Sequence, residues 1–179
     1  MKQLRVWGAT AAECADRYPC DDLGFEADEA FFRAVDVAAP PELVFRWLCQ
    51  LRAAPYSYDL LDNFARRSPP HLTPGLDRLE AGQRLMTIFR LVSFERDRHL
   101  TTALASRAGR LLMGDFAGTY RVAASATGPT RLVAKVLVRY PRGPYGALLR
   151  RGLPALDLVM FRKQLLTLRN YMERDALQR

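Results

Sequence analysis

The chain has 179 residues, of which 49% are hydrophobic and 26% are charged. This length suits one domain, and this composition is that of an ordinary globular protein. The longest apolar runs are far shorter than the roughly 18 residues needed to cross a bilayer. The first twenty residues contain acids and no apolar segment of a secretory signal. We therefore expect a single-domain cytoplasmic protein without a membrane span.

The net charge of +8 is distributed unevenly. Residues 1–32 carry three bases and seven acids, whereas residues 131–179 carry eleven bases and three acids. A basic C-terminal third can attract nucleic acid or anionic lipid, or it can be a solvated face neutralised in part by the acidic N-terminal segment. No nucleic-acid module or aromatic stacking pattern accompanies these bases, so we do not expect nucleic acid as a partner.

Few residues could bind a metal. The three cysteines, Cys14, Cys20 and Cys49, form no CxxC motif, and the two histidines, His71 and His99, lie in unrelated segments. A tetrahedral zinc site needs closely grouped ligands. We expect reduced, partly buried thiols, no metal and no cofactor.

The first half of the chain predicts an irregular arm, a strand and two helices. Residues 1–29 are rich in turns, with a short helix near 10–18. In the strand at 30–38, Arg33 shares a face with the apolar residues by the period of two. Pro40 and Pro41 begin a helix, whose single apolar stripe is made by Leu43, Val44, Trp47, Leu48 and Leu51. A second short helix is predicted at 58–64.

The second half predicts four strands and a long helix. The strands are expected at 84–95, 99–106, 115–125 and 131–140. Alternation in the last two places basic residues on the outer face and apolar residues on the inner face; the outer stripe is Arg121, Arg131, Lys135 and Arg139. We expect this stripe to be solvated. A helix is predicted at 154–174, with Pro154 in its first turn. The predicted fold class is α+β, a curved antiparallel sheet wrapped around the long C-terminal helix, with its core at 30–174.

Four strings resemble the START-like helix-grip (SRPBCC) superfamily, and within it bacterial proteins of the polyketide cyclase/dehydrase-like subgroup. They are residues 7–10 (WGAT), 33–42 (RAVDVAAPPE), 56–63 (YSYDLLDN) and 157–166 (DLVMFRKQLL). The third string is the most specific to the subgroup. The chain departs from the pattern at Cys20, where a glycine is usual, and at Pro55, where an aromatic residue is usual. The resemblance implies a cavity between sheet and C-terminal helix that holds a hydrophobic small molecule. Some relatives are enzymes and others are carriers or sensors, so the fold does not choose between them.

The third string supplies candidate ligand-binding residues for the cavity rim. These are Tyr56, Tyr58 and Asn63, and Tyr58 and Asp59 are weak candidates for acid–base catalysis. The alternative is a local role, in which Ser57 or Asp59 caps the short helix and the tyrosines are half-buried aromatics.

Other candidates lie on the strands and on the long helix. Arg33 either pairs with a ligand carboxylate or extends to water from the strand's end. Asp157, Gln164 and Tyr171 follow one edge of the helix at spacings of seven residues. Asp157 is expected mainly to complement the dipole of the helix in its first turn. Aromatic candidates for the cavity wall are Trp47, Phe89, Phe116, Tyr120 and Tyr140, of which Tyr120 is taken as a ligand-binding residue.

No catalytic motif stands out, because GxSxG, HExxH and phosphate-binding glycine loops are missing from the sequence. The first functional hypothesis is therefore a module that binds a hydrophobic or amphipathic small molecule. The alternatives are a polyketide cyclase/dehydratase-like enzyme and a basic interaction protein that acts through its outer stripe.

Overall fold

The computed structural model describes residues 2–24, 26–58 and 67–178. Within these ranges the strands form one mixed sheet in the order β1-β2-β7-β6-β5-β4-β3. β1 pairs with β2 in parallel, and the other neighbours are antiparallel. The strands are β1 Val6–Trp7, β2 Glu29–Val37, β3 Arg84–Leu85, β4 Phe89–Glu95, β5 His99–Leu104, β6 Asp115–Ala123 and β7 Thr130–Arg139.

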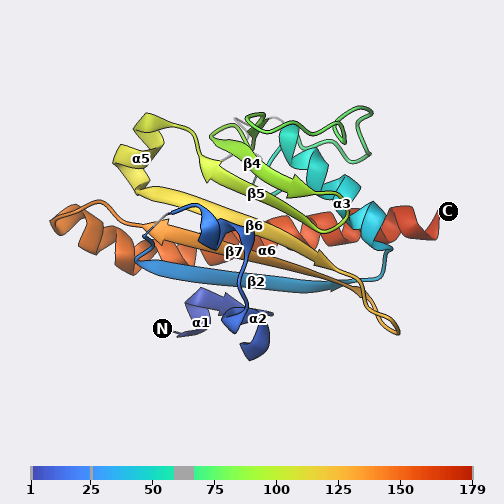
Figure 1. Cartoon of the computed structure of the whole chain (residues 1–179), viewed down its shortest axis with the longest axis horizontal. Helices are drawn as coiled ribbons and strands as arrows, with labels where there is room; N and C mark the ends of the chain where they lie inside the picture. The colour runs from blue at the N-terminus through green and yellow to red at the C-terminus, as the bar shows by residue number, and fades with distance from the viewer. Residues whose placement is uncertain (1, 25, 59–66, 179) are drawn as a thin grey trace.

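Helices lie on both faces of this sheet, as Figure 1 shows. The longest is α6, Pro144–Leu177, which runs along the inner face together with α3, Pro41–Cys49, and the 3-10 turn η2, Gln50–Arg52. α5, Arg107–Met113, connects β5 to β6. The N-terminal arm crosses the outer face and contains α1 Lys2–Arg5, α2 Ala11–Ala15 and the 3-10 turn η1 Pro19–Asp22. The predicted α+β class, with the long helix on one face of the sheet, is confirmed.

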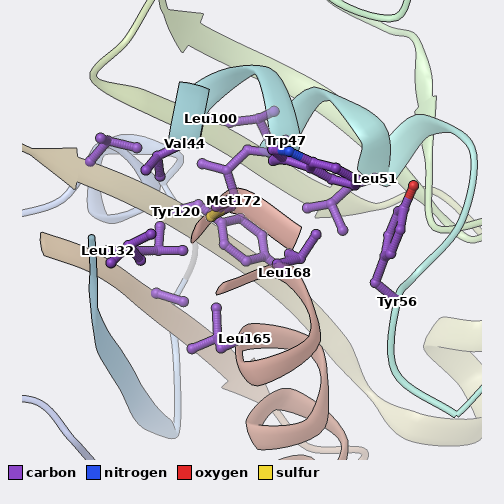
Figure 2. Packing of buried hydrophobic residues seen from close by; sticks show 14 of the residues in the cluster. Val44, Trp47, Leu51, Tyr56, Leu100, Tyr120, Leu132, Leu165, Leu168 and Met172 are labelled. Atoms are coloured by element: carbon purple, nitrogen blue, oxygen red, sulfur yellow. The ribbon is translucent and has the colours of Figure 1, made fainter. Parts of the chain in front are cut away.

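The main core lies between the inner face of the sheet and the two helices α3 and α6. Figure 2 shows side chains from α3, β6, β7 and α6 meeting there. Leu165, Leu168 and Met172 of α6 are completely buried. Their spacing of three and four residues places them on one side of the helix, so apolar burial holds the C-terminal half of α6 on the sheet.

α6 begins ten residues before the predicted start, at Pro144 instead of Pro154. Pro144 occupies the first turn, where its missing N–H costs nothing. Gly146 is required two residues later, because a Cβ there would lie 1.7 Å from the carbonyl oxygen of Pro141. Pro154 lies inside the helix, so it does not mark the helix start.

The outer stripe is not solvated as predicted, because the N-terminal arm covers most of it. Arg131 pairs with Glu13 at 2.7 Å, Arg121 pairs with Asp16 at 2.8 Å, and Lys135 pairs with Asp21 at 2.7 Å. The ring of Tyr18, completely buried, lies under the Arg121 guanidinium at 4.2 Å and near the Lys135 ammonium at 5.2 Å. Arg139 stays exposed. The acids of the arm thus neutralise most of the stripe.

Gly8, in the WGAT string at residues 7–10, has a clear physical role in the N-terminal arm. Gly8 has a φ of +76°, and a Cβ at this position would lie 2.1 Å from the carbonyl oxygen of Ala34 on β2. Only glycine lets the arm pass this close to the sheet.

Two further predictions have different outcomes. The single strand expected at 84–95 is two strands, because Met86 and Thr87 adopt left-handed backbone angles and turn the chain. Residues 59–64 of the helix predicted at 58–64 lie outside the described residues, and Tyr58 is not helical.

Candidate functional site

A cavity of about 390 Å³ lies between the sheet and the middle of α6. Its walls come from β4, β6, β7, α6 and the turn between β3 and β4, and they are mainly apolar. The lining residues are Pro55, Ser57, Met86, Thr87, Ile88, Phe89, Met113, Phe116, Val136, Leu153, Leu156, Asp157, Met160, Phe161 and Gln164. Thr87 and Leu156 are exposed, so the cavity opens to solvent between the β3–β4 turn and α6. Its volume is within the range of small-molecule sites.

Asp157 carries the only charge among these lining residues. One of its carboxylate oxygens accepts a 2.7 Å hydrogen bond from the Nη2 of Arg33. Burial raises the pKa of Asp157 to about 6, and the Arg33 charge opposes this shift. The hydrogen bond and charge of Arg33 favour the ionised carboxylate, whereas burial favours the neutral acid.

Arg33 does not extend to water from the strand's end; that alternative is wrong. Its side chain is completely buried on the inner face of β2. Its guanidinium donates to the carbonyl oxygens of Phe32 at 2.9 Å and Leu4 at 2.8 Å as well as to Asp157. Burial lowers its pKa, opposed by the Asp157 carboxylate. Arg33 is thus a partner of Asp157, and Asp157 is the member of the pair that faces the cavity.

The helix-dipole role expected for Asp157 is also wrong. Because α6 begins at Pro144, Asp157 lies more than three turns into the helix, beyond the first turn where the dipole acts. The edge that it shares with Gln164 faces the cavity, whereas Tyr171, further along, stacks on Trp47 with ring centroids 5.2 Å apart.

Gln164 lines the cavity and is hydrogen-bonded to Tyr120, which lies behind it. The Tyr120 hydroxyl donates to Oε1 of Gln164 at 2.7 Å, and Nε2 of Gln164 donates to the carbonyl oxygen of Pro55 at 2.6 Å. Burial raises the pKa of Tyr120, so its hydroxyl stays protonated and is a donor. Tyr120 itself lines a smaller adjoining cavity of about 60 Å³, which shares Met86, Phe89, Phe116, Val136 and Phe161 with the larger one.

The candidates of the third string are spread over different environments. Tyr56 is buried in the core, edge-on to Trp47 and Tyr171. Tyr58 has 39% of its surface exposed, and it is not a lining residue of the cavity. Asp59 and Asn63 lie outside the described residues. Pro55 and Ser57, their neighbours, do line the cavity.

Among the aromatic candidates, Phe89 and Phe116 line the cavity as expected. Trp47 belongs to the core behind it, and Tyr140 donates a hydrogen bond to Glu29. The contributions of Met86, Met113, Leu153 and Met160 to the cavity wall cannot be predicted from the sequence. These side chains meet only through tertiary packing, and methionine and leucine in a sequence indicate burial without saying against what.

Two further observations limit the chemistry of the described residues. No three His, Cys, Asp or Glu side chains among them come together as a metal site. No helix in the described ranges is both long enough and apolar enough to span a bilayer.

Solved structures with the same fold are found at low sequence identity. A hypothetical protein of Helicobacter pylori is 14% identical, with 88% of this chain and 96% of that chain covered and a TM-score of 0.53. A protein of Nitrosomonas europaea is 13% identical over 85% of this chain and 99% of that chain, with a TM-score of 0.51. The di-domain ARO/CYC StfQ from the steffimycin biosynthetic pathway is 12% identical over 82% of this chain, with a TM-score of 0.51. This chain covers 51% of StfQ, about half its length.

These likenesses, together with the sheet and the long C-terminal helix, establish a START-like helix-grip fold. The resemblance predicted from the four strings is thereby confirmed at the level of the fold. No family model matches the chain, and no curated protein matches its sequence.

Proposed function

We propose that the protein binds a hydrophobic or amphipathic small molecule in the cavity between the sheet and α6. The observation that supports this most strongly is the cavity itself, which has about 390 Å³ of space, a mainly apolar wall and one charged side chain. Apolar walls provide affinity and a few placed polar groups orient a ligand. Three free cysteines, two of them buried, fit a role in the reducing cytoplasm.

The polar groups of the wall favour a ligand with a neutral hydrogen-bond donor such as a hydroxyl. Both ends of the Gln164 amide have partners within the protein. Arg33 engages one oxygen of Asp157, and the carboxylate can accept a further bond. A ligand carboxylate would lie against the Asp157 carboxylate and be repelled. Arg33, Tyr56, Tyr58, Asn63, Tyr120 and Gln164 remain candidate ligand-binding residues, with Asp157 added to them.

Binding can be measured with the neutral dye Nile red and with decanol and decanoate as competitors. We expect saturable dye binding, with decanol displacing the dye at about tenfold lower concentration than decanoate above pH 7. Native mass spectrometry of the purified protein tests in parallel for a small molecule retained from the cell.

A cavity-filling substitution locates the binding site. Met160→Trp places an indole in the cavity wall and should abolish dye binding while the protein stays folded. Leu177→Trp is the matched control, because Leu177 is 90% exposed near the end of α6 and does not line the cavity. Full dye binding by a folded Met160→Trp protein would rule out this cavity as the site.

A second candidate function is a cyclase- or dehydratase-like enzyme. It is favoured by Asp157, whose pKa of about 6 suits proton transfer near neutrality, and by the fold shared with the ARO/CYC StfQ. A synthetic poly-β-ketone thioester would then be converted to a cyclised product, and Asp157→Asn would stop the conversion. Binding without conversion supports the carrier or sensor function instead.

A further inference from the structure

Exposed apolar side chains are concentrated on α5 and on the first half of α6. Of the nine large hydrophobic residues exposed in the described ranges, six lie on α5 and on the first half of α6. Leu111 is 81% exposed, Leu148 66% and Leu112 63%. We call the six residues the apolar end of the molecule: Leu111, Leu112, Tyr145, Leu148, Leu156 and Val159. A concentration of this kind marks an interaction site, whereas single exposed leucines do not.

The two helices are in contact at this end of the molecule. The hydroxyl of Tyr145 on α6 donates a 2.6 Å hydrogen bond to the carbonyl oxygen of Leu112 on α5. Figure 1 shows α5 and the first turns of α6 at the same end of the molecule. On α6, Leu148 and Val159 are eleven residues apart, which brings both to the same side of a helix.

The apolar end is also basic. Residues 104–113 and 141–156 together contain five arginines and no acid. Arg110 donates to the carbonyl oxygen of Leu104, and Arg150 pairs with Asp28 at 3.1 Å. The other three arginines, Arg107, Arg142 and Arg151, are exposed. None of these three has an ion pair within the described ranges.

This end adjoins the mouth of the cavity. Met113, the last residue of α5, and Leu153 and Leu156 of α6 all line the cavity. Leu156 belongs to both features, since it is 52% exposed at the apolar end. A partner seated on the apolar end would therefore lie next to the opening through which a ligand passes.

We propose that the apolar end docks on an anionic lipid surface, with its leucines in the interface and its arginines on the headgroups. Protruding apolar side chains flanked by arginines are the composition by which helices lie in a membrane interface. A second copy of this chain fits poorly, because a symmetric contact through this surface would set unpaired arginines against unpaired arginines.

Vesicle cosedimentation of the full-length protein tests this proposal. We expect binding to phosphatidylcholine vesicles that contain about one third phosphatidylglycerol, and weak binding to phosphatidylcholine alone. Leu111→Gln with Leu112→Gln should weaken the binding by at least about tenfold. The triple variant Arg107→Gln, Arg142→Gln and Arg151→Gln should weaken it by about a hundredfold, with a loss of its salt dependence.

The matched control variants carry the same kinds of substitution at positions elsewhere on the surface. Phe94→Gln removes an exposed apolar side chain from β4, and Arg46→Gln with Arg67→Gln and Arg96→Gln removes three exposed arginines. Both control proteins should bind like the unmodified chain. The proposal is overturned if the unmodified protein ignores anionic vesicles at low salt, or if the controls lose as much binding as the test variants. A dimer that dissociates in Leu111→Gln with Leu112→Gln, or binding to polyglutamate but not to vesicles, would also overturn it in favour of a protein partner.

Discussion

Asp157 and Arg33 form a buried ion pair, and each charge offsets part of the free-energy cost of burying the other. Each charge loses its hydration, and the 2.7 Å contact between them only partly replaces it. Nε of Arg33 has no hydrogen-bond partner within the described residues. Such a pair contributes little to net stability, but removal of one member leaves the other as an uncompensated buried charge.

Substitution of the pair should therefore be strongly non-additive. Asp157→Leu alone should lower the free energy of unfolding by about 3–5 kcal/mol, because Arg33 is left buried and unpaired. The double variant Arg33→Met with Asp157→Leu should recover most of this loss, since apolar residues of similar volume often replace a buried pair without penalty. Urea unfolding of the two single variants and the double variant measures the coupling energy. A double variant as unstable as Asp157→Leu alone would contradict this interpretation.

For a single residue, the sequence predicts the direction of the side chain more reliably than the residues that it contacts. The period of two along β2 correctly places Arg33 on the inner face with Phe31, Val35 and Val37. What it cannot supply is the partner, because Asp157 is 124 residues further along the chain. Because buried arginines are rare, the sequence alone favours an exposed Arg33. The carboxylate of Asp157 pairs with Arg33 and makes its burial possible.

Among the elements, β7 agrees closely with its predicted range and the start of the long helix differs most from its predicted position. β7 was expected at 131–140 and is found at Thr130–Arg139, since its alternation is unbroken. The sequence predicts too late a start for α6 because Pro154 suits a first turn, whereas the helix continues through this residue. The apolar end of the molecule lies largely on α5 and on this missed first part of α6, so it could not be foreseen.

The N-terminal arm is an element held by both charge and apolar contact. Glu13, on α2, accepts a hydrogen bond from Arg131 on β7. It accepts a second hydrogen bond from the backbone N–H of Thr10 in a capping box. These contacts, led by Arg131, lower the pKa of Glu13 from 4.5 to about 2. A carboxyl group whose pKa is lowered by folding stabilises the folded state above its unfolded pKa and loses that effect as the pH falls.

Glu13→Gln should therefore destabilise the protein in a pH-dependent way. A shift of about 2.5 pKa units corresponds to about 3.4 kcal/mol. Because the site is partly exposed to solvent, we expect a smaller loss of about 2 kcal/mol near pH 7. The difference from the unmodified protein should shrink as the pH falls from 4.5 towards 2, the window between the two pKa values. Thermal unfolding across this range measures it. Glu80→Gln, at an exposed position without an ion pair in the described ranges, is the control and should show no such trend.

At the scale of the whole molecule, the sheet is covered on both faces. α3 and α6 cover the inner face, and the arm covers the outer face, where Tyr18, Cys20, Phe32, Val133 and Leu137 are buried together. An antiparallel sheet with one solvated face would show polar residues along its outer side. Here Phe32, Val133 and Leu137 are apolar residues at outward positions, so the sheet depends on its cover. That the chain forms one domain remains a prediction, and this dependence supports it.

Deletion of residues 1–28 tests how much of the stability comes from this cover. The deletion uncovers the apolar outer face and also removes six acids and three bases. We expect a large drop in melting temperature, because burial of Tyr18 and its neighbours contributes about 1.5–3 kcal/mol for each large side chain. We also expect the uncovered outer face to bind a hydrophobic dye. The variant Glu13→Gln with Asp16→Asn and Asp21→Asn removes only the ion pairs and keeps the apolar contacts. It should lose much less stability, since partly exposed pairs contribute about 1 kcal/mol or less each and only the Glu13 pair exceeds this. If the charge variant unfolds as readily as the deletion, electrostatic attraction rather than apolar burial holds the arm on the sheet.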